Sequence, residues 1–234
     1  MNLVLLEQHE LDGSRARLDG RRAAHLVLVH RAEKGRRLRV GVLGGRVGVA
    51  TVVAIDPAGA ELEVELQRDA PAALPCTLVL ALPRPKVLRR LLGAAAAFGI
   101  KRLFLIGAER VEKSYWQSPV LEDAAVRAEL LLGLEQGCDT VLPVVTQRRR
   151  FRPFVEDELA ALAAGTLALV AHPAAATSCP RAVAGPVTVV VGPEGGFNSF
   201  EIALLEAAGL CAVSLSPRPL RVEQAVAALF GRLF

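Results

Sequence analysis

The sequence predicts an α/β protein in which a small β-rich domain precedes a larger domain with a mainly parallel sheet. Three observations lead to this prediction. Apolar and polar residues alternate in short segments over the first 70 positions, as in half-buried strands. Strand-like and helix-like segments then alternate, which is typical of a sheet covered by helices on both sides. A valine-rich run over 187–191 has the composition of a strand buried on both faces.

Length and composition limit the classes of protein to consider. A chain of 234 residues, 52% of them hydrophobic, can bury the cores of one large or two small domains. No stretch is long and apolar enough to span a bilayer, and Glu7, Glu10 and Asp12 argue against a secretory signal. The four cysteines are widely spaced, without a C-x-x-C pair. We therefore expect a cytoplasmic protein with reduced thiols, no metal site and no membrane partner.

The N-terminal domain is expected over residues 1–70. Segments 38–43, 46–55 and 61–66 have the period of strands, and the glycine-containing turns between them predict a small antiparallel barrel or sheet.

Basic residues gather in this same domain. Ten Lys and Arg side chains lie between Gly13 and Arg46, against two acidic ones. A one-sided basic cluster is the electrostatic footprint of a polyanion, although an arginine-rich surface that is merely solvated gives the same pattern. The candidates for RNA contact in this region are Arg21, Arg22, Arg36 and Arg37.

The second domain is expected over residues 74–234, after a linker rich in proline and alanine. Strands are expected over 77–82, 101–106, 141–145, 166–171, 187–191 and 211–215. Helices are expected over 85–98, 120–135, 156–164 and 225–234. One more helix is predicted to begin at a capping box of Asn198 with Glu201 and to end at Gly209.

The glycine-rich stretch 192–196 follows a buried strand and opens a helix, and a second loop, 216–220, follows the next strand. Ligands of open α/β sheets bind outside the carboxyl ends of strands, where both loops would lie. Phe197 and Asn198 stand where a P-loop needs Lys and Ser or Thr, and Glu194 would repel phosphates. A ligand with positive charge and an apolar ring system, such as S-adenosylmethionine (AdoMet), fits better. The alternative is a turn that is rich in glycine only for tight packing.

The stretch VGPEGGF, the helix after it and LSPRPLRVEQA resemble the C-terminal signature of the 16S rRNA (uracil-N3)-methyltransferase family, the small-subunit rRNA methyltransferase E group of the SPOUT superfamily. The resemblance covers most of the chain. It implies a PUA-like, RNA-binding β-barrel over 1–70 and a trefoil-knot methyltransferase domain over 74–234. It also implies AdoMet as cofactor, 16S rRNA of the small ribosomal subunit as partner, and a homodimer formed through the C-terminal domain.

The second signature departs from the family pattern at four positions. Family members carry Gly, Ile, Thr and Thr where this chain has Ser216, Pro219, Val222 and Gln224. These departures leave two alternatives open, which are a methyltransferase with another RNA target and an RNA-binding assembly factor on the same fold without chemistry. An enzyme acting on a phosphorylated small molecule is a third, disfavoured by the missing lysine and by Glu194.

The two loops and the strand ends before them supply the candidate site. The predicted cofactor-binding residues are His172, Pro173, Val191, Gly192, Pro193, Glu194, Gly195, Gly196, Leu215, Ser216, Pro217, Arg218 and Leu220. The predicted catalytic residues are Arg218, Arg221 and Glu223. Either arginine could stabilise a uracil anion. Either Glu223 or Glu194 could orient the arginines, accept the N3 proton through water, or lie near the sulfonium.

Further candidates for RNA contact lie outside the two loops. Arg84, Lys86 and Arg89 follow the first strand of the domain and could bind phosphates, or could be merely solvated. Tyr115 and Trp116 are the only Tyr and Trp of the chain and lie in a polar loop. They could stack on an unpaired base, or could pack on the neighbouring domain or a partner subunit.

Overall fold

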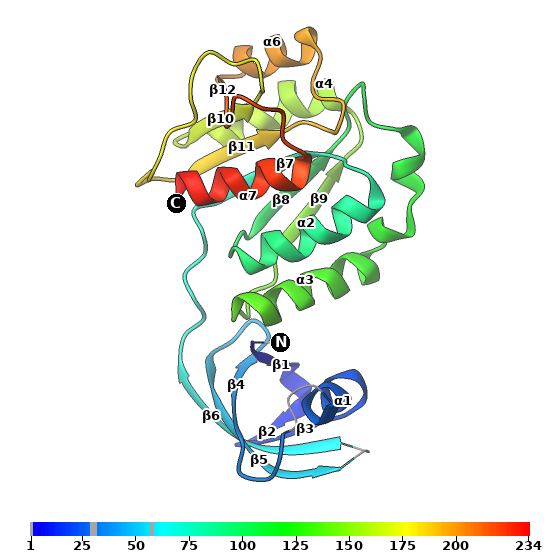
Figure 1. The fold of residues 1–234 in the computed structure, drawn as a ribbon, viewed down its shortest axis with the longest axis vertical. Coiled ribbons are helices and arrows are strands. Elements are labelled where there is room, and N and C mark those ends of the chain that lie inside the picture. The colour runs from blue at the N-terminus through cyan, green and yellow to red at the C-terminus, as the bar shows by residue number, and fades with distance from the viewer. Residues whose placement is uncertain (1, 29–31, 57–58) are drawn as a thin grey trace. The chain divides into compact units, whose positions relative to one another are not determined.

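The computed structural model describes residues 2–28, 32–56 and 59–234 (Figure 1). Within them, the side chains of Arg21 and His25 also lie outside the described part. Contacts divide the chain into two compact units. The N-terminal unit comprises Met1–Ala72 with Leu130–Leu142, and the C-terminal unit comprises Ala73–Glu129 with Pro143–Phe234.

The segment Leu130–Leu142 groups with the first unit, whereas the sequence placed it in the second domain. Long-range hydrogen bonds explain this difference. The backbone N–H groups of Asn2 and Leu3 donate to the carbonyl oxygen of Glu135 at 3.1 and 3.0 Å. Thr140 accepts from the N–H of Gly44 at 2.8 Å. Such bonds leave no trace in the linker composition from which the boundary was predicted.

The described part of the N-terminal unit contains a six-stranded sheet, the helix α1, a 3-10 helix and the C-terminal part of α3 (Asp123–Gly137). Its elements are β1 (Val4–Leu6), the 3-10 helix η1 (Gln8–Glu10), β2 (Leu11–Asp12), β3 (Arg15–Leu18), α1 (Gly20–Leu28), β4 (Arg37–Val42), β5 (Val47–Asp56) and β6 (Gly59–Arg68). The strand order is β1-β4-β5-β6-β3-β2, with β1 parallel to β4 and all other neighbours antiparallel. The three strands predicted in this region are confirmed as β4, β5 and β6.

Alternation of side chains builds this sheet. In β6, Ala60, Leu62 and Val64 are buried, whereas the glutamates between them are exposed. The buried face packs with Leu18 and Leu26 in one hydrophobic core. No pairing joins β1 to β2 among the described strands, so the closed PUA-like barrel stays a prediction.

The C-terminal unit alternates strands and helices. It contains β7 (Cys76–Ala81), α2 (Pro85–Ala97), β8 (Arg102–Ile106), the 3-10 helices η2 (Lys113–Gln117) and η3 (Pro119–Leu121), the start of α3 (Asp123–Gly137), β9 (Val144–Arg148), α4 (Phe151–Phe154), the π-helical turn η4 (Val155–Leu159), α5 (Ala160–Ala163), β10 (Leu167–Ala171), β11 (Val187–Val191), α6 (Ser199–Ala207), β12 (Cys211–Val213) and α7 (Val222–Leu233).

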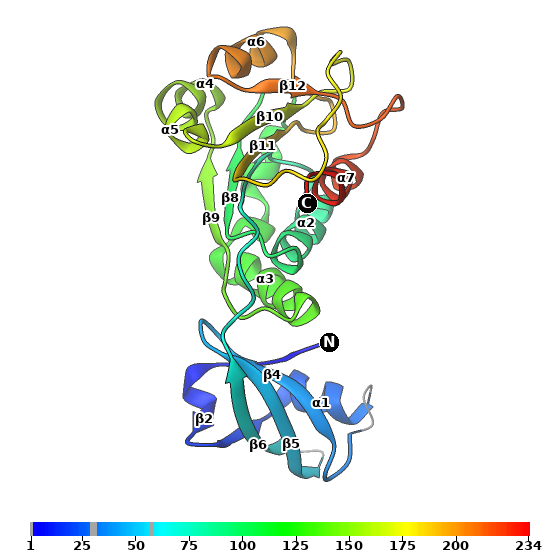
Figure 2. The ribbon, with the colours of Figure 1, turned by 90° about the vertical axis from the view of Figure 1, so that its left-hand side faces the viewer.

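The strand order in this unit is β12-β10-β11-β7-β8-β9, and every neighbouring pair is parallel. β7 and β11 are buried along their whole length, and for β11 the valine-rich run predicted this. Helices α2 and α7 lie on one face of the sheet, and α4 and α5 lie on the other (Figure 2). The predicted parallel sheet covered on both sides is therefore confirmed.

Two predicted boundaries in the middle of this unit are wrong. The strand expected over 141–145 is β9, at 144–148. In the segment before it, which is neither helix nor strand, the Asp139 carboxylate accepts from the N–H groups of Thr140 and Val141. The helical stretch expected over 156–164 begins at Phe151.

The sheet places several loops at one end. All strands are parallel, so the segments that follow β7, β10, β11 and β12 leave from the same edge. After β7 the chain continues outward to β8 and β9, whereas β10 and β12 lie on the other side of β11. Such a switch in strand order creates a crevice between diverging connections.

Candidate active site

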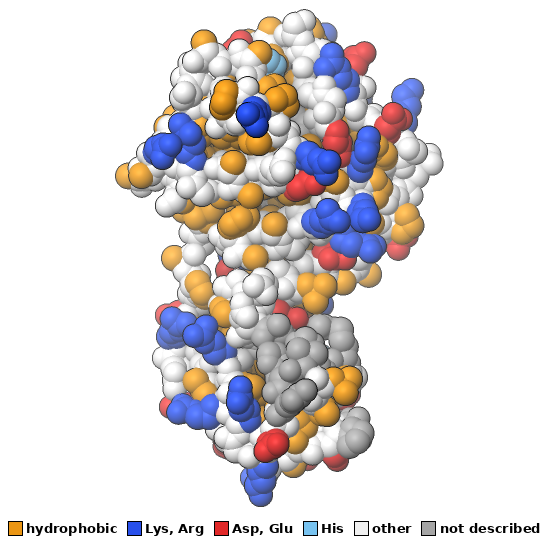
Figure 3. Space-filling model, in the orientation of Figure 1, with side chains coloured by type: hydrophobic (Ala, Val, Ile, Leu, Met, Phe, Trp, Pro, Cys, Tyr) orange, Lys and Arg blue, Asp and Glu red, His pale blue; other side chains and the backbone are white. Residues whose placement is uncertain are grey.

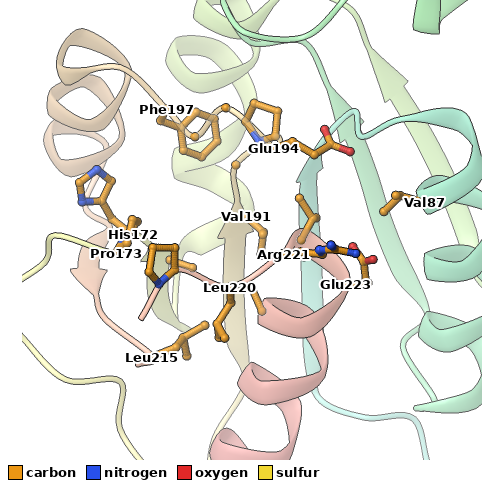
Figure 4. Close-up of a pocket in the computed structure, with 18 of the residues that line it drawn as sticks. Val87, His172, Pro173, Val191, Glu194, Phe197, Leu215, Leu220, Arg221 and Glu223 are labelled. Carbon is orange, nitrogen blue, oxygen red and sulfur yellow. The ribbon is translucent and has the colours of Figure 1, made fainter. Parts of the chain in front are cut away.

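A cavity of about 710 Å³ lies at this edge of the C-terminal unit (Figure 4). Every predicted cofactor-binding residue except Pro217 lines it, and so do the three predicted catalytic residues. A volume of this size is within the range of small-molecule sites, roughly 300–1,000 Å³. The two signature loops, separated in sequence by a helix and a strand, thus meet at one cavity.

Two glycines of the first loop are closely packed, and a third has a positive φ. A Cβ on Gly192 would lie 3.2 Å from the Phe197 ring and 3.3 Å from its backbone nitrogen. A Cβ on Gly195 would lie 3.1 Å from Cβ and Cδ of Arg110. Gly196 adopts a φ of +70° and donates its N–H to the Pro193 carbonyl, which closes the turn. The loop is therefore both tightly packed and exposed to the cavity along its backbone.

Glu194 has a contact that the sequence did not predict. Its carboxylate accepts from the backbone N–H of Arg84 at 3.0 Å. Arg84 is the N-cap of α2 and has no side-chain cap of its own. A negative charge at a helix N-terminus is favourable, so Glu194 joins the glycine-rich loop to the start of α2. One carboxylate oxygen is thereby committed to the fold.

The predicted capping box at α6 is confirmed and has an additional partner. Asn198 Oδ1 accepts from the N–H of Glu201 at 2.8 Å, and Glu201 Oε2 accepts from the N–H of Asn198 at 2.9 Å. The other oxygen, Oε1, accepts from the N–H of Glu109, in the loop after β8, at 2.7 Å. Glu201 is only 3% exposed. A buried carboxylate is thus satisfied by backbone donors from two loops.

Two departures from the family pattern have local roles in the second loop. Ser216 Oγ accepts from the N–H of Arg218 at 3.1 Å. Gln224 Oε1 accepts from the N–H of Arg221, the N-cap of α7, at 3.0 Å. This bond explains why α7 begins at Val222 and not at the predicted residue 225. Nothing in the structure explains the proline at position 219.

The three predicted catalytic side chains come from the end of this loop and the first turn of α7. Figure 4 shows Arg221 and Glu223 on the side of the cavity nearer Val87 of α2, whereas His172 lies on the opposite side. His172 is fixed through its backbone, because its N–H donates to the Val213 carbonyl at 2.9 Å.

The basic residues predicted around the start of α2 differ in their surroundings. Arg84 lines the cavity, Lys86 is exposed, and Arg89 forms a salt bridge with Glu129 at 3.1 Å. Figure 3 shows Lys and Arg side chains gathered over α2, with acidic side chains among them. Positive charge on this face is therefore partly neutralised.

Tyr115 and Trp116 lie in η2 and are half-buried. The Arg149 guanidinium carbon is 5.7 Å from the centroid of the Trp116 ring, a cation–π arrangement. Arg149 Nη2 also donates to the Trp116 carbonyl at 3.4 Å. A cation therefore stacks over one face of the ring.

In the N-terminal unit, Arg22 is engaged within the fold. Its Nη1 donates to Glu10 at 2.7 Å and to the Leu5 carbonyl at 2.7 Å. Burial acts to raise the pKa of Glu10, but hydrogen bonds from Arg22 and from the Glu7 backbone, with the charge of Arg22, leave that pKa below its ordinary value. Arg22 is therefore held in an internal ion pair, and its predicted contact with RNA stays a prediction.

The rest of the basic cluster is also divided. Arg15 pairs with Glu63 at 3.8 Å and Arg17 with Glu61 at 3.6 Å, because β3 and β6 are neighbours in register. The charge is thus less one-sided in space than in sequence. Arg36 and Arg37 are exposed and form no salt bridge within the described part of the chain. The predicted contact at Arg21 lies outside the described side chains.

Comparison with known proteins identifies the family. Residues 70–233 match the RNA methyltransferase domain. Ribosomal RNA small subunit methyltransferase E of Treponema pallidum is 31% identical over 97% of this chain and 88% of its own length. The protein of the same name from Mycobacterium tuberculosis is 30% identical over 94% of this chain and 86% of its own length. The chain belongs to the ribosomal RNA small subunit methyltransferase E family. The resemblance inferred from the two signatures is therefore confirmed.

Solved structures agree on the fold. Methyltransferase E of Neisseria gonorrhoeae, bound to S-adenosyl methionine, has a TM-score of 0.72 at 20% identity, covering 98% of this chain and 94% of its own. A Legionella pneumophila methyltransferase in complex with the cofactor SAM has a TM-score of 0.73 at 22% identity, with the same coverage. This member of the methyltransferase E family thus has the α/β fold of those proteins.

Several cavity residues of this family member were missed by the sequence analysis. Val87, Arg110, Phe197 and Ala225 all line the cavity. Arg110 follows β8, a strand with no glycine-rich signature after it, so only its spatial neighbours reveal its place.

The described residues contain no group of three or more His, Cys, Asp or Glu side chains that could hold a metal ion. Nor do they contain a helix with the length and apolar character needed to cross a membrane.

Proposed function

We propose that this protein methylates 16S rRNA of the small ribosomal subunit, at N3 of a uridine, with AdoMet as the methyl donor. One observation carries the proposal. Within a family of small-subunit rRNA methyltransferases, the two signature loops converge on one cavity that also presents Arg218, Arg221 and Glu223. The names of the relatives support the class of substrate, and the SAM-bound neighbours support the donor.

The cavity suits AdoMet in size and chemistry. Gly192 and Gly195 line the cavity and present backbone in place of side chains to a ligand. A Cβ at either position would press on Phe197 or Arg110 at 3.1–3.3 Å. Apolar walls from Val191, Leu215 and Leu220 suit an adenine ring. When bound, AdoMet supplies an electrophilic methyl group on its sulfonium. The predicted cofactor residues that line the cavity would hold it.

The protein's own side chains would act on the uracil. The N3–H is a weak acid, so methyl transfer requires removal of its proton and stabilisation of the anion. Arg221 or Arg218 would place a guanidinium beside that anion. A fixed positive charge stabilises a developing negative charge more strongly in a protein cavity than in water. Glu223 would accept the proton, directly or through water. We prefer Glu223 to Glu194 for this role, because the Arg84 N–H already occupies one oxygen of Glu194.

Hydrogen bonds of the segment between β10 and β11 support a trefoil knot. Ser178 forms a bridge with Ser214, and Cys179 donates its N–H to the Ser214 carbonyl at 2.9 Å. Farther along, Ala182 donates to the Arg232 carbonyl at 3.0 Å. The start of the connection after β12 and the C-terminal end of α7 are thus both bound by one segment, and we infer that the chain passes through that segment.

The N-terminal unit would provide the PUA-like contact to RNA, with Arg36 and Arg37 as exposed cations.

The C-terminal domain would pair with a second copy of itself. Support for that homodimer comes from the stacked rings of Phe230 and Phe234, with Phe234 41% exposed at the end of α7. Exposed aromatic rings are common in protein interfaces.

Titration calorimetry followed by mass spectrometry of the product tests the proposal. We expect the wild-type protein to bind AdoMet and S-adenosylhomocysteine, and to add one methyl group at uracil N3 when incubated with unmodified small subunits. Arg221→Ala should keep S-adenosylhomocysteine affinity within about threefold and slow transfer by about 100-fold or more. The matched control is Arg181→Ala. Arg181 is exposed and lies near the C-terminal end of α7, away from the cavity.

Two results would contradict this assignment. Full transfer by Arg221→Ala would remove the electrostatic role of that arginine. Absence of cofactor binding by the wild-type protein, with and without RNA, would favour the alternative of an RNA-binding assembly factor. A methyl group at another nucleotide or atom would leave the enzyme class standing and change only the target.

A further inference from the structure

We infer that Arg110 binds a backbone phosphate of the RNA at the mouth of the cavity while it holds the glycine-rich loop. The inference rests on the proposed function and assigns a role to a cavity residue that the proposed chemistry does not use.

Arg110 is in direct contact with the glycine-rich loop. Its Nη1 donates to the Gly195 carbonyl at 2.6 Å. Its aliphatic stem lies on the same glycine, where a Cβ would come within 3.1 Å of the Cβ and Cδ of the arginine. The side chain is therefore placed by a hydrogen bond and by packing, and it still borders the cavity.

The backbone on both sides of Arg110 is also fixed. The preceding residue, Glu109, donates its N–H to the buried carboxylate of Glu201 at 2.7 Å. Gly107 donates its N–H to the Arg148 carbonyl at 2.9 Å and leaves no room for a Cβ against the carbonyl of Arg149. The guanidinium is therefore held in place before any ligand arrives, which lowers the entropic cost of binding.

The donors of Arg110 are mostly unused. It is exposed, and within the described part of the chain no carboxylate pairs with it. A guanidinium has five N–H donors in a planar fork, and the Gly195 carbonyl takes one of them. The remaining donors match the oxygens of a phosphate.

The charge of the cavity favours an anion at its mouth. Four arginines (Arg84, Arg110, Arg218 and Arg221) line it against two glutamates (Glu194 and Glu223), an excess of two positive charges by subtraction. One oxygen of Glu194 already accepts from a backbone N–H. Because Arg110 is exposed to solvent, it is better placed for a large ligand that arrives from outside than for an enclosed cofactor.

Three variants test this inference. Arg110→Gln removes the charge, Arg110→Lys keeps it without the fork, and Arg181→Gln removes an exposed charge elsewhere in the same unit. Affinity for unmodified small ribosomal subunits is measured at several KCl concentrations with saturating S-adenosylhomocysteine. We expect Arg110→Gln to weaken binding about tenfold and to lower the slope of log affinity against log salt by about one. Arg110→Lys should keep the wild-type slope, and Arg181→Gln should change neither quantity.

Cofactor titrations show whether Arg110 binds an RNA phosphate or the carboxylate of the cofactor. S-adenosylhomocysteine carries an amino-acid carboxylate, and methylthioadenosine lacks it. If Arg110→Gln weakened only S-adenosylhomocysteine and left the salt slope unchanged, the anion would be that carboxylate and the inference would be overturned. Equal weakening of both nucleosides with an unchanged slope would reduce Arg110 to a support of the loop, and would overturn it too. A wild-type protein that binds neither cofactor nor subunits would refute the proposed function itself.

Discussion

Glu201 accepts a hydrogen bond from the backbone N–H of Glu109 at 2.7 Å, across 92 residues of sequence. Its other oxygen accepts from the N–H of Asn198 at the start of α6. One buried carboxylate thus joins the loop that follows β8 to the end of the glycine-rich loop. The relative positions of Arg110 and Gly195, which lie in these two loops, depend on it.

Replacing Glu201 by Gln should destabilise the protein by roughly 1–3 kcal/mol. Glutamine has one carbonyl oxygen, so one of the two backbone donors would face an amide NH2 group. Urea unfolding measures the change. Glu206→Gln, at an exposed position on the same helix, should change stability by less than about 0.5 kcal/mol. Equal effects of the two substitutions would show that the buried bonds contribute nothing specific.

Two glycine-to-alanine substitutions should have opposite effects on the free energy of unfolding. Gly192→Ala should cost roughly 1–3 kcal/mol and weaken cofactor binding, because the new methyl would meet the Phe197 ring and backbone. Gly231→Ala, inside α7 with nothing within 4 Å of its Cβ position, should stabilise by about 0.5–1 kcal/mol. Thermal unfolding with and without S-adenosylhomocysteine distinguishes them. A neutral Gly192→Ala would mean that the loop relaxes freely.

The ion pair of Glu10 with Arg22 predicts that the free energy of unfolding falls at acidic pH. The pKa of Glu10 lies below its ordinary value of 4.5 in the folded state, so its contribution is fully present above pH 4.5 and is lost as the pH falls through the folded value. Glu10→Gln should lower stability by roughly 1–3 kcal/mol at pH 7. The difference from wild type should shrink below pH 4.5. A difference that stays constant down to pH 3 would rule out the ion pair as its source.

The cysteines should differ in reactivity. Burial raises the pKa of the Cys76 thiol to about 12, whereas Cys211 is exposed. Because the thiolate is the nucleophile, iodoacetamide at pH 8 should label Cys211 rapidly and Cys76 only after unfolding. Peptide mass spectrometry over time follows both sites. Labelling of Cys76 at the rate of Cys211 would contradict the burial of β7.

Arginines of the N-terminal unit should differ in their effect on RNA affinity. Arg37 is exposed without a salt bridge among the described residues, whereas Arg15 pairs with Glu63 across β3 and β6. Arg37→Gln should lower the salt slope of subunit binding by about one, and Arg15→Gln should lower it less. The opposite order would place the RNA on the β3–β6 face of the sheet.

Periodicity predicted the architecture of the C-terminal unit well, because its strands are apolar throughout and its helices begin and end at recognisable residues. The fully buried β11 and the capping box at Asn198 are examples. Boundaries failed where side chains act on the backbone. The Asp139 carboxylate binds the N–H of Val141, where a strand was expected to begin, and Gln224 extends α7 by a turn.

The signature loops predicted more than half of the cavity lining, since both follow strands that end at one edge of a parallel sheet. Arg110 could not be found in this way, because its partner is a backbone carbonyl 85 residues away. Charge along the sequence was also misleading. The glutamates that neutralise Arg15 and Arg17 come from β6, and only the strand register brings them together.

Trp116 is the only tryptophan among the 234 residues, and the Arg149 guanidinium lies over its ring. Fluorescence excited at the tryptophan wavelength therefore reports on a single position of the molecule. That position is in η2, the 3-10 helix that follows the loop of Arg110, and Arg110 borders the cavity. A partner that displaced the Arg149 guanidinium from the ring would change the tryptophan emission. Stopped-flow fluorescence could therefore measure the rate at which that partner binds the unlabelled wild-type protein.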